Sequence, residues 1–296
     1  MAFTRGVWYM VVSVFFFSCM GLMVKLVPHI PSTQVVFFRS IISFGLSFLM
    51  LKQQRVSVWG NNRRLLILRG MCGAVALILF YETLQNIPLA SAVTIGFLAP
   101  IFTTLLGVFI IGEKVYKLQW LFFLAAFGGV IMVQGFDPRI APIYFIIGVI
   151  ATFFSGLAQN FIRKVNTSEH PLVIIFYFPL ITTPITGIYS AFNWEPPQGW
   201  DWVILISIGL FTQFAQYFMT KSIQMEELSK VSIIRYLGIV YALIFGYIFF
   251  GETYNIYAYA GMGLAILGVI LNLWYKQRKT KQQITNEEKL RKVKSS

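Results

Sequence analysis

The sequence predicts an all-α membrane protein, with ten transmembrane helices arranged as two inverted five-helix repeats. Two observations carry this prediction. The 296-residue chain is 57% hydrophobic and only 12% charged, which excludes an ordinary soluble domain. Residues 1–135, moved forward by 139 positions, also align without a gap on the second half of the chain. Because each half holds five apolar segments, an odd number, the second copy must enter the membrane in the opposite sense.

Identical residues at equivalent positions define the repeat. Glu113 aligns with Glu252, and Lys25 aligns with Lys164. Inverted repeats of this kind are typical of secondary transporters, which bind substrate where the two halves meet. The predicted divisions of the chain are a first repeat at 1–135, a second repeat at 142–276 and a basic tail at 277–296.

The predicted spans follow from the lengths of the apolar blocks. Each block runs for about 17–23 residues, the length that a helix needs to cross roughly 30 Å of hydrocarbon. The alternating pattern of a transmembrane barrel is absent from the sequence. The predicted spans are 6–26, 34–51, 65–83, 90–111, 118–135, 142–160, 172–192, 202–221, 229–250 and 256–275.

The distribution of basic residues predicts the orientation. The net charge is +13, but nineteen of the 24 Lys and Arg residues lie in alternate loops and in the tail, against Arg139 alone in the opposite loops. The positive-inside rule then predicts a multi-pass protein of the inner (plasma) membrane with both termini in the cytoplasm. The basic excess is therefore an orientation signal, and no nucleic-acid partner is predicted. The tail is expected to be disordered or to lie on anionic headgroups of the lipid bilayer.

No cofactor or metal ion is predicted. Cys19 and Cys72 both lie in predicted spans, where packed thiols are expected rather than a disulfide or a metal site. The sequence also contains no Walker motif, so ATP hydrolysis is not expected of this chain.

Three arginines lie within predicted spans and are the first candidates for substrate binding: Arg39, Arg69 and Arg235. A charged side chain within hydrocarbon is costly and marks a functional candidate. The alternative for each is that its long side chain snorkels to the nearest membrane surface. For Arg69, which lies close to Arg63 and Arg64, snorkelling is the favoured alternative.

Polar and aromatic residues supply further candidates. Gln213, Gln216 and Tyr217 are spaced so that they share one helix face, which should face protein or a water-filled cavity rather than lipid. Hydrogen bonding between helices is the alternative role. The remaining predicted substrate-binding residues are Tyr81, Gln159, Tyr236 and Tyr241.

Three residues are predicted to have structural roles. Glu113 and Glu252 each follow a glycine that closes an apolar run, which suits a helix end. Pro100 should kink the fourth span. The equivalent position in the second repeat is Ile239, so this kink is expected in the first half only.

Several segments resemble a known family. They are Leu68-Arg69-Gly70, Ile87-Pro88-Leu89-Ala90-Ser91-Ala92, Leu98-Ala99-Pro100-Ile101-Phe102 and Gly112-Glu113-Lys114, repeated by Ile239-Val240-Tyr241-Ala242 and Phe250-Gly251-Glu252. Over residues 5–276 the chain resembles the drug/metabolite transporter superfamily, specifically its EamA branch. The resemblance implies a ten-helix transporter. Members are associated with amino acids and their derivatives, S-adenosylmethionine, riboflavin, organic anions and metallophores, moved in either direction.

One departure from the family pattern limits what the resemblance implies about substrate. Arg235 and Tyr236 stand where many members carry smaller or acidic residues, so no family substrate is carried over to this chain.

The sequence therefore predicts a secondary transporter that moves a small organic metabolite, an amino-acid derivative or an organic anion, by alternating access. Intramembrane arginines favour a carboxylate or phosphate on the substrate. S-adenosylmethionine or riboflavin is the alternative substrate type. The scarcity of intramembrane carboxylates favours an exchanger or facilitator over a proton-coupled carrier.

Two other classes of protein remain as alternatives. A polytopic membrane enzyme would need clustered catalytic groups, but His29 and His170 lie in loops on opposite sides and no carboxylate pair lies within the spans. A channel is the second alternative, and saturable uptake with counterflow would separate it from a carrier. The oligomeric state is left open, with a homodimer as one arrangement.

The predicted orientation can be tested by labelling. With Cys19 and Cys72 replaced by alanine, we expect Asn193→Cys to react with a membrane-impermeant maleimide in intact cells, and Val56→Cys to react only after lysis. Labelling of Val56→Cys in intact cells would show that the first half is inserted the other way round.

Overall fold

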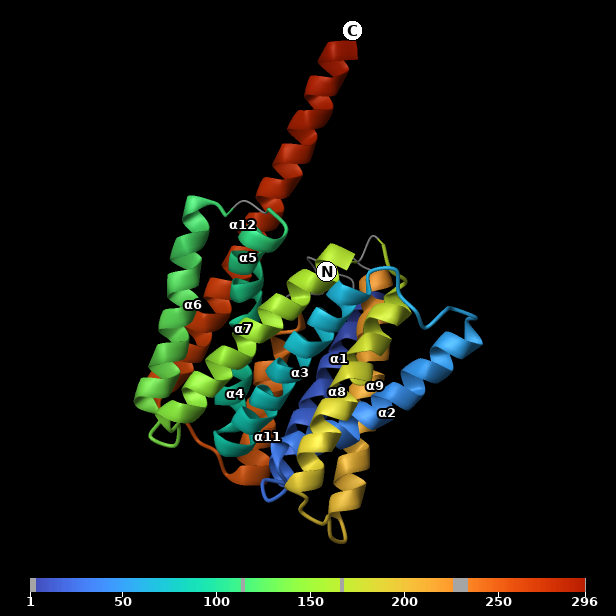
Figure 1. Ribbon diagram of the computed structural model, residues 1–296. Coiled ribbons are helices and arrows are strands. Elements are labelled where there is room, and N and C mark those ends of the chain that lie inside the picture. The colour runs from blue at the N-terminus through green and yellow to red at the C-terminus, as the bar shows by residue number, and fades with distance from the viewer. Residues whose placement is uncertain (1–3, 113–114, 166–167, 226–233, 296) are drawn as a thin grey trace.

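The computed structural model describes residues 4–112, 115–165, 168–225 and 234–295, and it contains no strand within these ranges. All regular structure in this part of the chain is helical (Figure 1). The helices are α1 (Arg5–Leu26), α2 (Ser32–Gln53), α3 (Arg63–Asn86), α4 (Leu89–Gly96), α5 (Ala99–Ile110), α6 (Lys117–Phe136), α7 (Pro142–Val165), α8 (Pro171–Phe192), α9 (Asp201–Met225), α11 (Leu237–Phe250) and α12 (Ile256–Ser295).

The helices have the lengths and composition of membrane spans. In the described part of the chain, nine segments are long and apolar enough to cross a membrane, and α4 and α5 together form one of them, Leu89–Ile110. The shorter apolar helix α11 lies within the predicted ninth span, whose first residues fall outside the described ranges. The chain is thus a multi-pass membrane protein.

The internal repeat is visible in the helix bounds. Helix α2 covers residues 32–53, and α8 covers 171–192, which is the same interval displaced by 139. The pairs α1 and α7, α3 and α9, α5 and α11, and α6 and α12 begin within two residues of this displacement. Equivalent sequence therefore folds into equivalent helices in the two halves.

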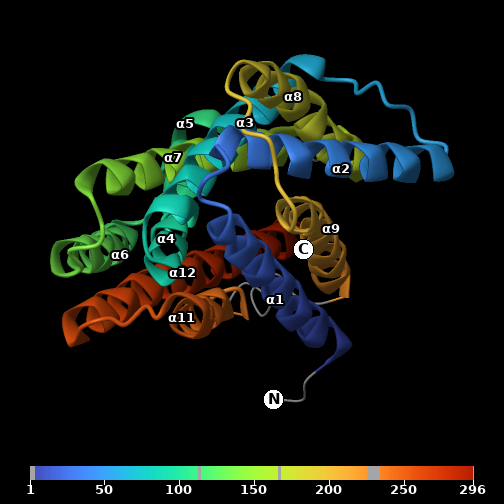
Figure 2. The same cartoon turned by 90° about the horizontal axis from the view of Figure 1, so that it is seen from below.

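The packing of the helices follows the same symmetry. Helix α1 packs on α9 and α3 packs on α7, and the repeat exchanges these two contacts. Helices α2 and α6 each pack on their own equivalents, α8 and α12. These last two pairs lie on opposite sides of the bundle (Figure 2). Because α1 and α7 run in opposite directions along the bundle, the repeats are inverted (Figure 1).

Small residues allow α6 and α12 to touch through their backbones. A Cβ atom added to Gly129 would lie 2.4 Å from the backbone nitrogen of Ala265, and one added to Gly268 would lie 2.6 Å from that of Ala126. These two contacts are exchanged by the repeat. Small-residue faces of this kind let transmembrane helices approach closely, so that packing can hold them together where lipid gives no hydrophobic driving force.

The fourth span is broken rather than kinked at Pro100. Helix α4 ends at Gly96 and α5 begins at Ala99, so Pro100 lies in the first turn of α5, where its missing N–H leaves no hydrogen bond unmade. The expectation that only the first half is interrupted is wrong. A turn at residues 235–236 also precedes α11, although Ile239 stands in place of the proline.

The two interruptions lie against each other. Phe97 precedes α5 and Tyr236 precedes α11, and the repeat makes these residues equivalent. Their ring centroids are 4.7 Å apart, within the range of favourable aromatic pairs. The broken helices of the two halves therefore meet near the centre of the repeat symmetry.

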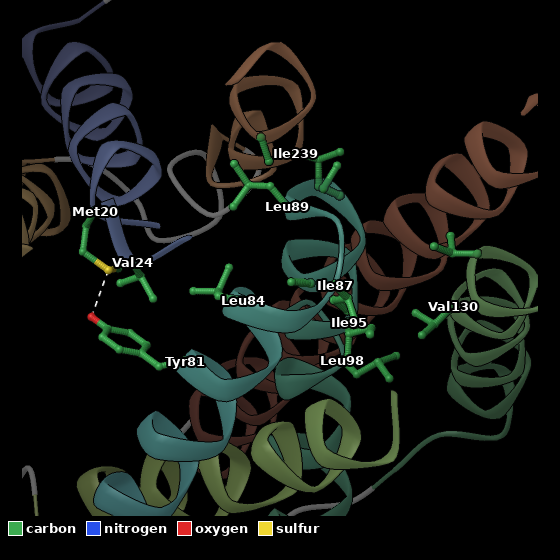
Figure 3. Close-up of a cluster of buried hydrophobic side chains, with 14 of the residues drawn as sticks. Met20, Val24, Tyr81, Leu84, Ile87, Leu89, Ile95, Leu98, Val130 and Ile239 are labelled. Atoms are coloured by element: carbon green, nitrogen blue, oxygen red, sulfur yellow. Dashed lines mark hydrogen bonds between the residues drawn. The ribbon is translucent and has the colours of Figure 1, made fainter. Parts of the chain in front are cut away.

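A buried apolar cluster joins the halves around this point. It includes Leu89 and Ile95 of α4, Val130 of α6 and Ile239 of α11, all at most 2% exposed. Leu89 and Ile239 lie close together between α4 and α11 (Figure 3). Aliphatic side chains therefore add to the aromatic contact between Phe97 and Tyr236 in joining the halves.

The C-terminal tail is helical where disorder was expected. Helix α12 continues from its membrane span to Ser295. Lys, Gln, Glu and Arg dominate this extension, and these unbranched side chains have high helix propensity. The absence of apolar periodicity therefore does not prevent a continuous helix here.

The close contact of α6 and α12 predicts a sharp difference between neighbouring glycines. We expect Gly129→Ala to lower the melting temperature of the detergent-purified protein by several degrees, because a methyl group there collides with backbone and overpacking costs about 1–3 kcal/mol. Gly128→Ala is the matched control, since nothing lies within 4 Å of its added Cβ. Equal melting temperatures for the two variants would contradict the contact.

Candidate functional site

The guanidinium of Arg39 is buried inside the helical bundle. Arg39 lies about 10 Å from the start of α2, given a rise of 1.5 Å per residue, and is 7% exposed. Its Nε donates a hydrogen bond to Thr212 Oγ1 of α9 at 3.1 Å. Its Nη1 is buried and has no hydrogen-bond partner among the described residues.

The second arginine, Arg69 on α3, also turns inward. Its Nε and Nη1 atoms are buried and have no hydrogen-bond partner in the part of the chain that the structure describes. The snorkelling alternative favoured from the sequence is therefore wrong for Arg69, because a snorkelling side chain would place these donors in water.

One aromatic ring receives both guanidinium groups. The Cζ atom of Arg69 lies 4.7 Å from the centroid of the Phe178 ring of α8, and the Cζ atom of Arg39 lies 6.0 Å from it. Arg39 also faces the ring of Tyr81 at 5.6 Å. Within the described residues, neither arginine forms an ion pair with a carboxylate. We call Arg39, Arg69 and Phe178 the arginine pair site.

Tyr81 closes one side of this site. It is fully buried on α3, and its hydroxyl donates to the sulfur of Met20 on α1 at 2.9 Å (Figure 3). The ring is therefore held with its face toward Arg39.

The site is a place where the two repeats differ in chemistry. The displacement of 139 residues makes Arg39 equivalent to Phe178, and Thr212 equivalent to Gly73. The contact of Arg39 with Thr212 thus corresponds to the contact of Phe178 with Gly73, where an added Cβ would lie 2.8 Å from the ring. The repeat brings a cation from one half against an aromatic face from the other.

The structure does not bring the remaining predicted binding residues into contact with the arginine pair. Gln159 is exposed, whereas its neighbour Asn160 is buried and donates to Thr103 O at 2.9 Å. Gln213 and Gln216 are half-buried. Gln216 lies one turn beyond Thr212, on the same face of α9.

The predicted residues of the ninth span lie at the second helix break. Arg235 is exposed in the turn before α11, while Tyr236 is buried against Phe97. Tyr241 is half-buried and stacks on Phe245.

A second charged cluster closes the end of the bundle opposite the termini. The Lys25 ammonium of α1 lies 2.9 Å from a carboxylate oxygen of Glu252, which follows α11. The same carboxylate accepts a hydrogen bond of 2.9 Å from the backbone N–H of Leu89, the first residue of α4. A carboxylate at a helix N-terminus is favoured by the helix dipole. We call this contact the Lys25–Glu252 junction, and it joins the first half to the second.

Residues of two loops extend the junction. The Tyr254 hydroxyl donates to Glu252 at 3.1 Å, and burial followed by the Glu252 charge raises the pKa of this phenol, so it stays protonated. Arg139 forms a bidentate pair with Asp137 at 2.8 Å, and these hydrogen bonds raise the pKa of the guanidinium. Arg139 also donates to Thr253 O at 2.6 Å. The equivalent glutamate, Glu113, lies outside the described residues.

Two residues that contact the arginine pair, Phe178 and Thr212, were not predicted from the sequence. Phe178 is one of 29 phenylalanines and carries no signal in an apolar helix. Thr212 adjoins Gln213 but was not singled out. A comparison of the repeats could have found Phe178, because it stands opposite a charged residue at the equivalent position.

Inverted repeats of membrane-spanning helices are the architecture of many secondary transporters. The sequence pattern of the EamA-like transporter family matches residues 4–134 and 142–274. The chain belongs to this family. The two matched stretches correspond to the two halves of the bundle, so the family shares the repeated architecture.

Named relatives are transporters with different substrates. The pseudopaline exporter CntI of Pseudomonas aeruginosa is 29% identical over 269 residues, covering 90% of this chain and 94% of the relative. Human solute carrier family 35 member G1 is 27% identical and covers 93% and 81% of the two chains. The S-adenosylmethionine uptake transporter of Rickettsia felis is 24% identical, and the match covers 63% of each chain.

A solved crystal structure supports the fold. It superposes with a TM-score of 0.64 at 16% identity and covers 92% of this chain and 98% of its own, a likeness that shows the fold alone. With the family and the named relatives, the function is that of a membrane transporter for a small metabolite.

Proposed function

We propose that this protein is a secondary carrier for a small organic anion, such as an acidic amino-acid derivative, and that Arg39 and Arg69 bind its acidic group. The observation that carries the proposal is the burial of two guanidinium groups with unpartnered N–H donors and no carboxylate partner among the described residues. Buried donors left unpaired cost free energy, so a ligand that accepts their hydrogen bonds is favoured.

The chemistry of the pair suits an oxyanion. A guanidinium stays charged at all physiological pH values and offers a planar set of donors that matches carboxylate and phosphate oxygens. Stacking on Phe178 fixes the orientation of both groups without using their N–H donors.

The location that we propose is the inner (plasma) membrane with both termini in the cytoplasm. The start of α1 and the end of α12 lie toward the same end of the bundle (Figure 1). The basic residues of the alternate loops and the tail favour the cytoplasmic side for this end. Exposed apolar side chains such as Phe109 and Leu124, 86% and 70% exposed, suit contact with lipid or with a second copy of the chain.

The relatives support a transporter rather than an enzyme, but they differ in direction. One is named an exporter and another an uptake transporter, so direction does not follow from family membership. Of the predicted substrate types, an organic anion fits the arginine pair better than the cationic S-adenosylmethionine.

The mechanism that we propose is alternating access between the two halves. The Lys25–Glu252 junction joins the halves at the end opposite the termini and must open to admit substrate there. In sequence, the repeat makes Lys164 and Glu113 the equivalents of Lys25 and Glu252. When one end of the bundle opens, the other would close. The outward-open and inward-open arrangements would then be related by the exchange of the two halves.

The arginine pair predicts which substitutions abolish substrate binding. For any acid that stabilises the wild type in a thermal-shift panel, we expect Arg39→Gln and Arg69→Gln each to weaken binding about tenfold or more, because a hydrogen bond to a charged group contributes about 1.5–3 kcal/mol. Replacement by Lys should restore binding only in part, since lysine lacks the planar fork. Arg64→Gln, at an exposed position on α3, is the control. Unchanged affinity in both variants would remove the pair from the site.

The junction predicts opposite effects of two equivalent lysines. With Cys19 and Cys72 replaced, Ser91→Cys reports on the outer end, because Ser91 is fully buried two residues beyond Leu89. We expect Lys25→Met to increase labelling of this cysteine by an impermeant maleimide in intact cells, and Lys164→Met to leave it unchanged or decrease it. No increase with Lys25→Met in a monodisperse protein would contradict the proposed outer closure.

A further inference from the structure

We infer that the substrate carries two negative charges, one for each arginine of the pair, so that it is a dicarboxylate or another dianion. This inference rests on the proposed function and specifies the substrate class of the same site. It depends on how the charges and free donors around Phe178 are distributed.

Each of the two arginines has at least one unpartnered hydrogen-bond donor. Arg39 commits its Nε to Thr212 and leaves Nη1 unpartnered, while Arg69 leaves both Nε and Nη1 unpartnered. These donors come from α2 and α3, on guanidinium groups that face the same ring of α8. A ligand that satisfies all of them must present acceptors to both groups.

The protein supplies no negative charge to this site from the helices that form it. Helices α2 and α8 contain no Asp or Glu, and the acidic residue of α9, Asp201, pairs with His29. The acidic residue of α3, Glu82, lies thirteen residues beyond Arg69, about 20 Å along the helix. These helices therefore provide no carboxylate to compensate the two positive charges, and a bound anion could do so.

We infer the number of charges on the substrate from the two positive charges of the arginine pair and the lack of a compensating carboxylate on these helices. Two like charges in a site of low polarity repel each other, and a monoanion would leave one of them uncompensated. A dianion compensates both, and its second acidic group gains charge-assisted hydrogen bonds that a neutral group would not. The aromatic faces of Phe178 and Tyr81 contact the guanidinium groups without accepting hydrogen bonds from their unpartnered N–H donors.

The test compares each dianion with its closest singly charged analogue. The dicarboxylates from malonate to adipate are each measured against the corresponding monoamide, by thermal shift and tryptophan fluorescence of the purified full-length protein at constant ionic strength. We expect at least one dicarboxylate to bind and its monoamide to bind at least tenfold more weakly. In Arg69→Gln the two should bind alike, because one cation remains, whereas Arg64→Gln should keep the wild-type preference.

The outcomes separate this inference from the proposed function. If a dicarboxylate and its monoamide bind equally well to the wild type, and Arg39→Gln and Arg69→Gln weaken both, the substrate is a monoanion and only the dianion inference fails. If no acid in the series binds to the wild type, and none changes the thermal stability of the arginine variants, the dianion inference and the proposed function both fail. A preference for the dianion that persists in Arg69→Gln would also overturn the inference, because it would place the second charge elsewhere.

Discussion

The low polarity of the bilayer is the constraint on which the rest of this structure depends. It requires each backbone polar group to find a partner within its own segment, which makes every described span a helix. It also makes each unpaired charge costly. Lys25 meets this cost through Glu252, whereas Arg39 and Arg69 keep buried donors without a carboxylate partner in the described part of the chain. The contrast between a paired and an unpaired cation distinguishes the proposed closing contact from the proposed binding site.

The repeat symmetry explains most of the architecture, and it is broken at the proposed binding site. The contact of α6 with α12 is nearly identical when the halves are exchanged, down to the glycine that meets a backbone nitrogen in each helix. The breaks before α5 and α11 also correspond, and their equivalent rings contact each other at a tilt of 39°. At the arginine pair the chemical equivalence is lost, because the position of Arg39 in the first half is occupied by Phe178 in the second half. Symmetric contacts build the bundle, and the asymmetric contact lies at the proposed binding site.

The positions of the two clusters suggest how binding and closure are connected. Helix α1 supplies Met20, which holds Tyr81 beside Arg39, and it ends near Lys25 of the junction. Helix α3 carries Arg69 and Tyr81 and leads to Leu89, whose N–H binds Glu252. A substrate that draws the arginines together would therefore act on the helices whose ends form the junction. This connection is part of the proposed mechanism of alternating access.

The sequence by itself determined the fold class, the number and approximate positions of the spans and the transporter function, because apolar length and the internal repeat are properties of the chain alone. It also marked Arg39 and Arg69 as unusual, since a charge in an apolar run is visible without coordinates. Only the tertiary structure decided that Arg69 turns inward, that Phe178 receives both guanidinium groups, and that Gln159 is exposed beside a buried Asn160. These facts depend on the rotation of each helix and on which helix lies beside it. Most of these helices are apolar on all sides, so their sequences carry little information about which face turns toward protein and which toward lipid.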